Sequence, residues 1–326
     1  MHFRSSVDRV LAYWVMGVAL AILLALGSLA LINRLVYGPE GQVRAYFAAL
    51  REGDGAKALG ILGVEAPDAG AAVLDGKGLK AAVDSLHNVD LTTLEITDGG
   101  QKATVRASYT LDGQEASTDF SLHKVGSHWG VFDSWNIDLE ELPTVKVESP
   151  MVQAATLNNV KVAIADGDED FGAFFPGLYT VTYESALFSA SSDRVALTSA
   201  EGEPTLKVAL EPSDAAKASV QQQVRTYLDS CATQNSLYPA GCPFEYDFTG
   251  RVSGNVTWTI KEYPEPAVSL DGNRWKLGPG KGIAEISFTQ LDLYTGKTKQ
   301  VTDQVPFKLS GRLTTSDQTI TFTPAT

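Results

Sequence analysis

The chain has 326 residues, enough for two or three small domains with cores of their own. Its apolar fraction of 44% and charged fraction of 20% are ordinary for folded protein, which excludes disorder of the whole chain. The formal net charge of −13 disfavours nucleic-acid binding, because an acidic surface repels phosphate, and it should also keep the exterior part off anionic lipid headgroups.

The first predicted element is a helix long enough to cross a membrane. Residues 11–32 carry no charge, and about 20 such residues span the hydrocarbon core. Tyr13 and Trp14 stand at its start, where aromatic side chains favour the interface. We expect residues 1–10 to be a short cytoplasmic tail, because a long segment translocates largely regardless of its charge. The alternative is a cleaved signal peptide, whose apolar region of about 7–15 residues is shorter than this one.

Gly17, Ala21 and Ala25 recur every four residues, so they share one face of this helix. Small residues at that spacing let two membrane helices approach closely, which is one route to a homo-oligomer. Glycine and alanine are also common in membrane helices for other reasons, so that composition alone is the alternative explanation.

Residues 39–137 have the pattern of one α+β unit. A helix should begin at Pro39, and a weaker helical pattern continues through residues 58–62. The first helix has one apolar face, formed by Val43, Tyr46, Phe47 and Leu50.

A second short helix is expected at Leu79, Val83 and Leu86, after which the apolar period changes from 3.6 to 2. A meander of about four strands follows, with a hairpin at Asp112-Gly113 and another turn at Gly126-Ser127.

Residues 143–212 carry little helix signal. Short apolar runs alternate with turn residues at near-regular spacing, which is typical of a small immunoglobulin-like β sandwich. The predicted strands lie near residues 145–147, 160–162, 179–183, 195–197 and 206–208.

Residues 213–326 begin with a helix capped by Ser213, and a meander of long strands follows with a bend at residues 294–296. We interpret residues 39–137 and 213–326 as a diverged structural repeat, because an amphipathic helix precedes a meander in both. In this repeat Tyr46 and Phe47 correspond to Tyr227 and Leu228 on the helices. Large strand side chains should fill the interior, among them Trp129, Val131, Trp258 and Ile260.

Cys231 and Cys242 are the two cysteines of the chain, which excludes a zinc ribbon or iron–sulfur cluster built on cysteine alone. In an oxidising exterior they should pair, and closing so short a loop is worth about 3 kcal/mol in the chain-entropy model. The alternative is a redox-active pair, but the Cys-x-x-Cys spacing is absent, so we expect a structural disulfide.

Two sets of residues are candidate metal ligands. His123 and His128 flank the predicted turn at Gly126 and, with His87, could form a metal site, although solvated surface histidines are the simpler explanation. Asp166, Asp168 and Asp170 alternate in a predicted loop. An EF-hand would need glycine where Phe171 stands, so a solvated acidic turn is the better explanation. We therefore expect no metal and no cofactor.

Asp119 and Asp133 neighbour aromatic residues and are the candidates for acid–base chemistry on an apolar wall. The sequence contains no Gly-x-Ser-x-Gly, no His-Glu-x-x-His and no phosphate-binding loop. We expect a protein that is not an enzyme and has no catalytic residues.

A curved sheet around an N-terminal helix resembles the nuclear-transport-factor-like fold, over residues 39–137 and 213–326. The whole order, an anchor and then such a unit, a small β domain and another unit, is similar to that of TcaA-type bacterial membrane proteins. The run from Pro176 to Val181, PGLYTV, looks like turn-to-strand runs in their β domains. The segment from Cys231 to Phe244, which contains PAGCPF, looks like part of actinobacterial surface proteins.

These features predict an α+β protein with a single transmembrane helix, two helix-plus-curved-antiparallel-sheet units and an immunoglobulin-like β domain between them. The resemblance implies an extracytoplasmic, non-catalytic envelope protein that binds a cell-wall component, a ligand or a partner protein. One alternative is an accessory subunit of an envelope transport or wall-synthesis complex. Another is a small-molecule carrier or cavity enzyme, which a buried carboxylate or histidine in an apolar pocket would favour.

Overall fold

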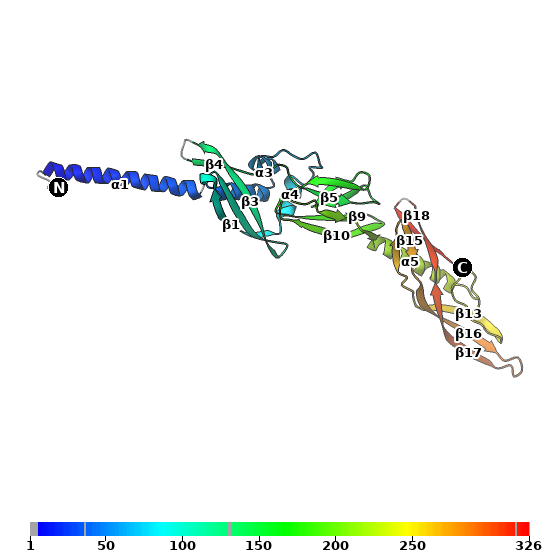
Figure 1. Cartoon of the computed structure of the whole chain (residues 1–326). Coiled ribbons are helices and arrows are strands. Elements are labelled where there is room, and N and C mark those ends of the chain that lie inside the picture. Colours follow the sequence, from blue (N-terminus) through cyan, green and yellow to red (C-terminus); the bar gives the residue numbers. More distant parts are fainter. Residues whose placement is uncertain (1–5, 36, 129–131, 317, 326) are drawn as a thin grey trace. The chain divides into compact units, whose positions relative to one another are not determined.

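The computed structural model describes residues 6–35, 37–128, 132–316 and 318–325. Within these residues the fold is mixed α+β, with five α-helices and several antiparallel sheets (Figure 1). The chain divides into two compact units. Unit 1 comprises Met1–Val181 and Ser192–Lys207, and unit 2 comprises Thr182–Ser191 and Val208–Thr326. Unit 1 therefore takes in residues 39–137 with most of residues 143–212, and the three separate exterior domains stay a prediction.

The N-terminal helix α1 (Ser6–Leu35) is 30 residues long (Figure 1). Its Val10–Ser28 portion is apolar enough to cross a membrane, and none of that portion is buried. At about 1.5 Å per residue these 19 residues extend roughly 28 Å, close to the hydrocarbon thickness of about 30 Å. By length and composition α1 is thus either a membrane span or a signal sequence.

Three helices open the folded part of unit 1. The predicted apolar face of the first of them is confirmed, because Val43, Tyr46, Phe47 and Leu50 are all buried. That helix ends at Gly53, whose φ of 72° is the left-handed conformation that favours glycine. The helices are α2 (Pro39–Glu52), α3 (Gly55–Leu62) and α4 (Gly76–Val83).

A four-stranded antiparallel sheet in the order β1-β2-β3-β4 follows, and α2 packs against it. The predicted hairpin at Asp112-Gly113 is present, with both residues at positive φ and Leu111 paired to Gln114. A short 3₁₀ helix, η1 (Asp98–Gly100), joins β1 to β2. The strands are β1 (Leu86–Thr97), β2 (Lys102–Leu111), β3 (Gln114–His128) and β4 (Phe132–Ile137).

Two local predictions in this region were wrong. Leu86 does not end a helix, because α4 stops at Val83 and Leu86 is the first residue of β1. Gly126 and Ser127 do not form a turn. They lie inside β3, where the pairing with β4 shifts by one residue between Lys124 and Gly126. A glycine within a strand often marks such a bulge, and here the strand continues through it. Trp129 and Val131 lie outside the described residues.

The remaining strands of unit 1 form two small sheets. In one, β5 lies between β11 and β8; in the other, β9 lies between β10 and β6, and β7 is next to β6. The five predicted strands are present, and β6 and β8 are additional. The bounds are β5 (Thr144–Glu148), β6 (Ala154–Leu157), β7 (Val160–Ala163), β8 (Asp168–Gly172), β9 (Gly177–Glu184), β10 (Phe188–Leu197) and β11 (Thr205–Lys207).

The helices and the small sheets of unit 1 share one core. Phe120 of β3 stacks on Phe175 with ring centroids 5.8 Å apart, and Tyr46 lies edge-on to Phe120. At a second place the backbone of Gly70 forms a parallel β-bridge with Phe171. These contacts join segments that are far apart in the sequence, which is why residues 39–137 and the first strands after them form one unit.

Unit 2 contains the end of β9 and the start of β10, which pairs with β12 (Leu210–Pro212), and it continues with the helix α5 (Asp214–Ala232). Ser213 caps this helix as predicted, and its hydroxyl accepts a 3.0 Å hydrogen bond from the Ala216 N–H. A three-stranded antiparallel sheet in the order β13-β16-β17 and two hairpins complete the unit. The strands are β13 (Arg251–Glu262), β14 (Val268–Asp271), β15 (Arg274–Leu277), β16 (Gly280–Leu291), β17 (Thr298–Leu309), β18 (Gly311–Ser316) and β19 (Thr319–Pro324).

The core of unit 2 lies between α5 and these strands. Leu228 and Trp258 are buried in it, whereas Tyr227 and Ile260 are partly buried at its margin. Residues 39–137 and 213–326 each place helical structure before antiparallel strands, but the first range has three helices there and the second has one.

Candidate functional site

The predicted cysteine pair lies at the end of α5. The Sγ atoms of Cys231 and Cys242 are 2.11 Å apart, which is disulfide-bonding distance. Inside the loop that they close, the Gln234 side chain accepts from the Ala240 N–H at 2.8 Å and donates to the Ala240 carbonyl at 3.1 Å. The Trp258 indole donates to the Ser236 carbonyl at 2.8 Å. These hydrogen bonds order the loop within itself and against β13. The disulfide is therefore part of an ordered structural element.

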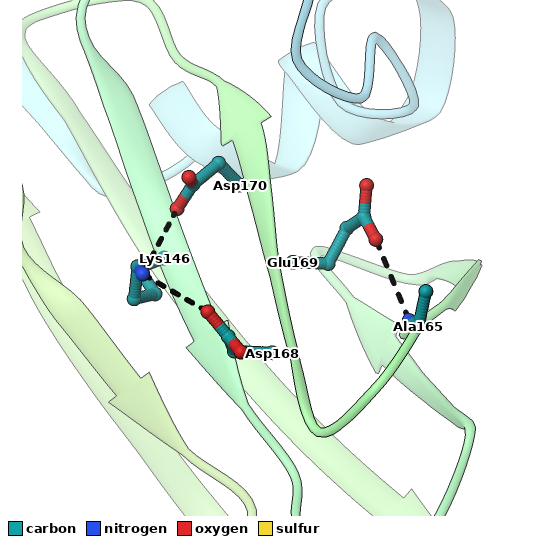
Figure 2. Close-up of polar contacts among 5 residues, drawn as sticks. All are labelled: Lys146, Ala165, Asp168, Glu169 and Asp170. Carbon is teal, nitrogen blue, oxygen red and sulfur yellow. Dashed lines mark hydrogen bonds and ion pairs between the residues drawn. The ribbon is translucent and has the colours of Figure 1, made fainter.

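The predicted acidic loop is a strand over most of its length. Asp168 and Asp170 belong to β8, opposite Lys146 of β5, and the alternation of strand side chains puts both carboxylates on one face. Figure 2 shows the Lys146 ammonium between them, 3.0 Å from Asp168 and 4.0 Å from Asp170. Glu169 points away from this face and accepts from the Ala165 N–H. The Lys146 ammonium thus occupies the position between the two carboxylates that a bound metal ion would need.

The three predicted histidines are not brought together. His87 of β1 lies opposite Thr110 near the end of β2, whereas His123 of β3 lies opposite Lys102 at the start of β2. His123 and His128 both lie on β3, five residues apart, which is roughly 17 Å along an extended strand. His123 contacts the carboxylate of Asp138 instead. Among the described residues, no group of three or more His, Cys, Asp or Glu side chains could hold a metal ion.

The two candidate acid–base carboxylates lie in ion pairs near solvent. Both oxygens of Asp119 accept from the Arg106 guanidinium at 2.7 Å, and 44% of the Asp119 side chain is exposed. The hydrogen bond from Arg106 lowers the pKa of Asp119, so this group is a stable carboxylate. Asp133 pairs with Lys124 at 2.5 Å. A general acid requires a neutral carboxyl held against apolar walls, and Asp119 does not meet this condition.

A groove between α2 and the edge strand β1 brings charged groups together in unit 1. It has a volume of about 330 Å³. Arg44, Ala48 and Arg51 follow one another at i, i+4 and i+7, so they present one face of α2 to it. The opposite wall is the β1 segment from Val89 to Leu91, and Phe47 also contributes to the lining.

Two bulges in β1 shape this groove. The ladder with β2 shifts between His87 and Asp90 and again between Thr93 and Glu95. Asn88, in the first shift, has a positive φ of 54°. At the second shift, one carboxylate oxygen of Glu40 accepts from both the N–H and the hydroxyl of Thr93, at 3.0 and 2.9 Å. Bulges bend a strand and re-aim its side chains, and the Glu40 bonds fix the edge against the start of α2.

The groove has the chemistry of a binding site for anions. Two guanidinium groups and one carboxylate, Asp90, line it beside the apolar surface of Phe47 and Leu91. Guanidinium groups bind carboxylate and phosphate with paired hydrogen bonds. The sequence contained one signal for this site, because Arg44 and Arg51 lie just off the apolar face of the predicted helix, but nothing local placed β1 opposite them.

The chain matches no protein-family model, no curated protein and no solved structure. The findings that bear on function are therefore the geometry of the groove, the apolar helix and the disulfide.

Proposed function

We propose that this protein is a membrane-anchored, extracytoplasmic envelope protein that is not an enzyme and that binds an anionic ligand or partner in the groove between α2 and β1. The groove carries the proposal. It is an open recess lined by two arginines, in a chain whose net charge is −13. A cationic site on an acidic protein selects anions locally and repels them elsewhere.

The anchor is supported by α1 and the compartment by the disulfide. Val10–Ser28 has the length of a membrane span, and Cys231 and Cys242 lie at bonding distance, as expected of an oxidising environment. We place residues 1–10 in the cytoplasm and both units outside it. Mass spectrometry of the membrane fraction should find α1 on the same chain as unit 2, and a membrane form that lacks Val10–Ser28 would contradict an anchor.

We also propose that residues 39–137 and 213–326 have nuclear-transport-factor-like folds, that residues 143–212 are immunoglobulin-like, and that the whole belongs with TcaA-type proteins. The packing of α2 on a four-stranded antiparallel sheet supports the first, and the two small sets of strands support the second. An experimental structure of either unit, compared with proteins of that type, tests this.

The binding proposal has a direct test. Butyl phosphate should bind the full chain and butylammonium, a cation of equal chain length, should not. Arg44→Gln with Arg51→Gln should weaken the phosphate ligand on the order of tenfold or more, because each charge-assisted contact contributes about 1.5–3 kcal/mol. Arg106→Gln is the matched control, since Arg106 is an exposed arginine of the same unit that pairs with Asp119 outside the groove. Equal loss in both variants would contradict the groove as the site.

A further inference from the structure

The connection between β16 and β17 carries two large apolar side chains in full solvent. We call residues 292–297 the hairpin tip, since Leu291 and Thr298 close the ladder below it. Leu293 is 78% exposed and Tyr294 is 98% exposed, the two highest values among the large apolar side chains of the described chain. Holding both in water is unfavourable unless another surface covers them.

The hairpin tip is an ordered turn. The Asp292 carboxylate accepts from the N–H groups of Tyr294 and Thr295, at 2.8 and 2.9 Å. The Asp292 backbone bonds to Gly296 and Lys297, at 2.8 and 2.9 Å, and Gly296 has a φ of 69°. These bonds use backbone groups and Asp292, so the side chains of Leu293 and Tyr294 take no part in forming the turn. The backbone conformation of the turn therefore directs the side chains of Leu293 and Tyr294 outward.

The hairpin tip and the rungs next to it carry three cations and one carboxylate, whereas the whole chain is acidic. Lys297 of the tip and Lys299 beside it are exposed, and Arg251 is opposite Leu291 in the last rung. No ion pair engages these three cations in the part of the chain that the structure describes, and the one carboxylate of the hairpin tip, Asp292, is bonded to backbone N–H groups.

Apart from Asp292, the nearest carboxylates along the hairpin lie well below the tip. Asp303 pairs with Ile286 in the ladder, five residues before Leu291, which is roughly 17 Å at strand spacing. It accepts a hydrogen bond from Tyr246, and Glu285, one residue further, pairs with Lys261. Salt screens charges beyond about 8–10 Å, so a surface that touches the tip meets these three cations and the single carboxylate of Asp292.

We propose that the hairpin tip docks on the surface of an anionic lipid bilayer. Leucine and tyrosine insert at the interface between headgroups and acyl chains, and the lysines and the arginine meet the anionic headgroups. The acidic composition predicts that the exterior part stays off anionic lipid, and the tip is the local exception because its charges are separated from the rest. This inference concerns unit 2 and does not depend on the groove in unit 1.

The test uses the full chain, with α1 held in a phosphatidylcholine nanodisc. Both native cysteines are in the disulfide, so Tyr294→Cys supplies the sole free thiol for an environment-sensitive nitrobenzoxadiazole label. Vesicles of equimolar phosphatidylglycerol and phosphatidylcholine should shift its emission to the blue, and vesicles of phosphatidylcholine alone should not. Placing a spin-labelled quencher lipid in the nanodisc or in the vesicles identifies which membrane the tip enters.

A second experiment measures how much unlabelled native or variant protein sediments with the vesicles. Leu293→Ser with Tyr294→Ser should reduce binding on the order of tenfold, because it removes the inserting surface and leaves the turn intact. Lys297→Gln with Lys299→Gln should remove the preference for phosphatidylglycerol. Leu94→Ser with Ile96→Ser is the matched control, since this second exposed apolar pair, 46% and 58% exposed, flanks Glu95 and not a cation. No vesicle binding by the native chain at low salt, or equal binding by the native chain and the tip variant, would overturn the proposal.

Discussion

The hydroxyl of Tyr46 on α2 donates a 2.7 Å hydrogen bond to the carbonyl oxygen of Phe175, 129 residues further along the chain. Tyr46 is fully buried, and Tyr179 donates in the same way to the neighbouring Phe174 carbonyl at 2.8 Å. Both carbonyls precede β9 and would otherwise be unpaired in the core. Tyr46 therefore joins α2 to the segment before β9 through a satisfied polar contact as well as through aromatic packing, and Tyr179 holds that same segment against β9.

Replacing Tyr46 tests this junction. Tyr46→Phe keeps the ring in the core but leaves the Phe175 carbonyl without its partner, so we expect the free energy of unfolding of unit 1 to fall by about 1–3 kcal/mol. Urea denaturation followed by circular dichroism measures the change. Tyr294→Phe is the matched control, since the Tyr294 side chain is almost wholly exposed and its loss of a hydroxyl should change stability by less than about 0.5 kcal/mol. A Tyr46→Phe protein as stable as the native one would show that the bond contributes nothing.

High pH should unfold unit 1 through the same tyrosines. Burial raises the pKa of Tyr46, with the neighbouring Tyr179 adding to the effect, and burial likewise raises the pKa of Tyr179. A group whose pKa is higher in the folded state stabilises fully below its unfolded pKa, near 10 for tyrosine, and loses that contribution as the pH rises beyond it. Stability should therefore fall above about pH 10, by up to about 1.4 kcal/mol per pH unit for each such tyrosine.

Tyrosinate absorbance and circular dichroism, recorded together, check this prediction. As the pH rises, part of the tyrosinate absorbance should appear only when the secondary structure is lost. Tyr179→Phe should reduce this part of the absorbance change. Complete ionisation of the tyrosines while the circular dichroism spectrum stays native would show that burial does not hold their protons.

Reducing the disulfide should destabilise unit 2. The bond between Cys231 and Cys242 closes a short loop, and its loss should cost about 2–4 kcal/mol, together with faster hydrogen exchange at the end of α5. Reductant should have no effect on Cys242→Ala, which is the matched control because Cys231, buried in the core, keeps its sulfur. Native protein that unfolds at the same urea concentration with and without reductant would refute a stabilising role.

Two glycines in α3 should respond in opposite ways to alanine. A methyl group on Gly55 would overlap the carbonyl oxygen of Leu74, and the Gly55 N–H donates to Asp75 at 2.9 Å, so the backbone cannot retreat without losing that bond. Gly55→Ala should destabilise unit 1 by about 1–3 kcal/mol or more, as overpacking does. Gly60 has no atom within 4 Å of the same position, so Gly60→Ala should stabilise α3 by about 0.5–1 kcal/mol through helix propensity. Thermal unfolding of the native protein and both variants measures this: the midpoint temperature should fall for Gly55→Ala and rise for Gly60→Ala.

Much of the secondary structure follows from local sequence. The uncharged run of α1, the apolar stripe of α2, the Ser213 cap of α5 and the hairpin at Asp112-Gly113 each depend on residues within a few positions of one another. Their physical causes, helical or strand periodicity, capping and turn conformation, act over the same short range. Local sequence is therefore enough to place these elements and the cysteine pair, and to infer an α+β chain.

The tertiary structure alone decided what those elements bring together. The residues Asp168–Gly172 form a strand because β5 pairs with them, and Gly126 stays within β3 because β4 pairs across the bulge. The groove needs β1 to lie beside α2, and the core of unit 1 needs Phe175 to reach Tyr46. Pairing register, bulges and side-chain packing depend on which other segment lies opposite, and the local pattern of one segment does not encode its partner.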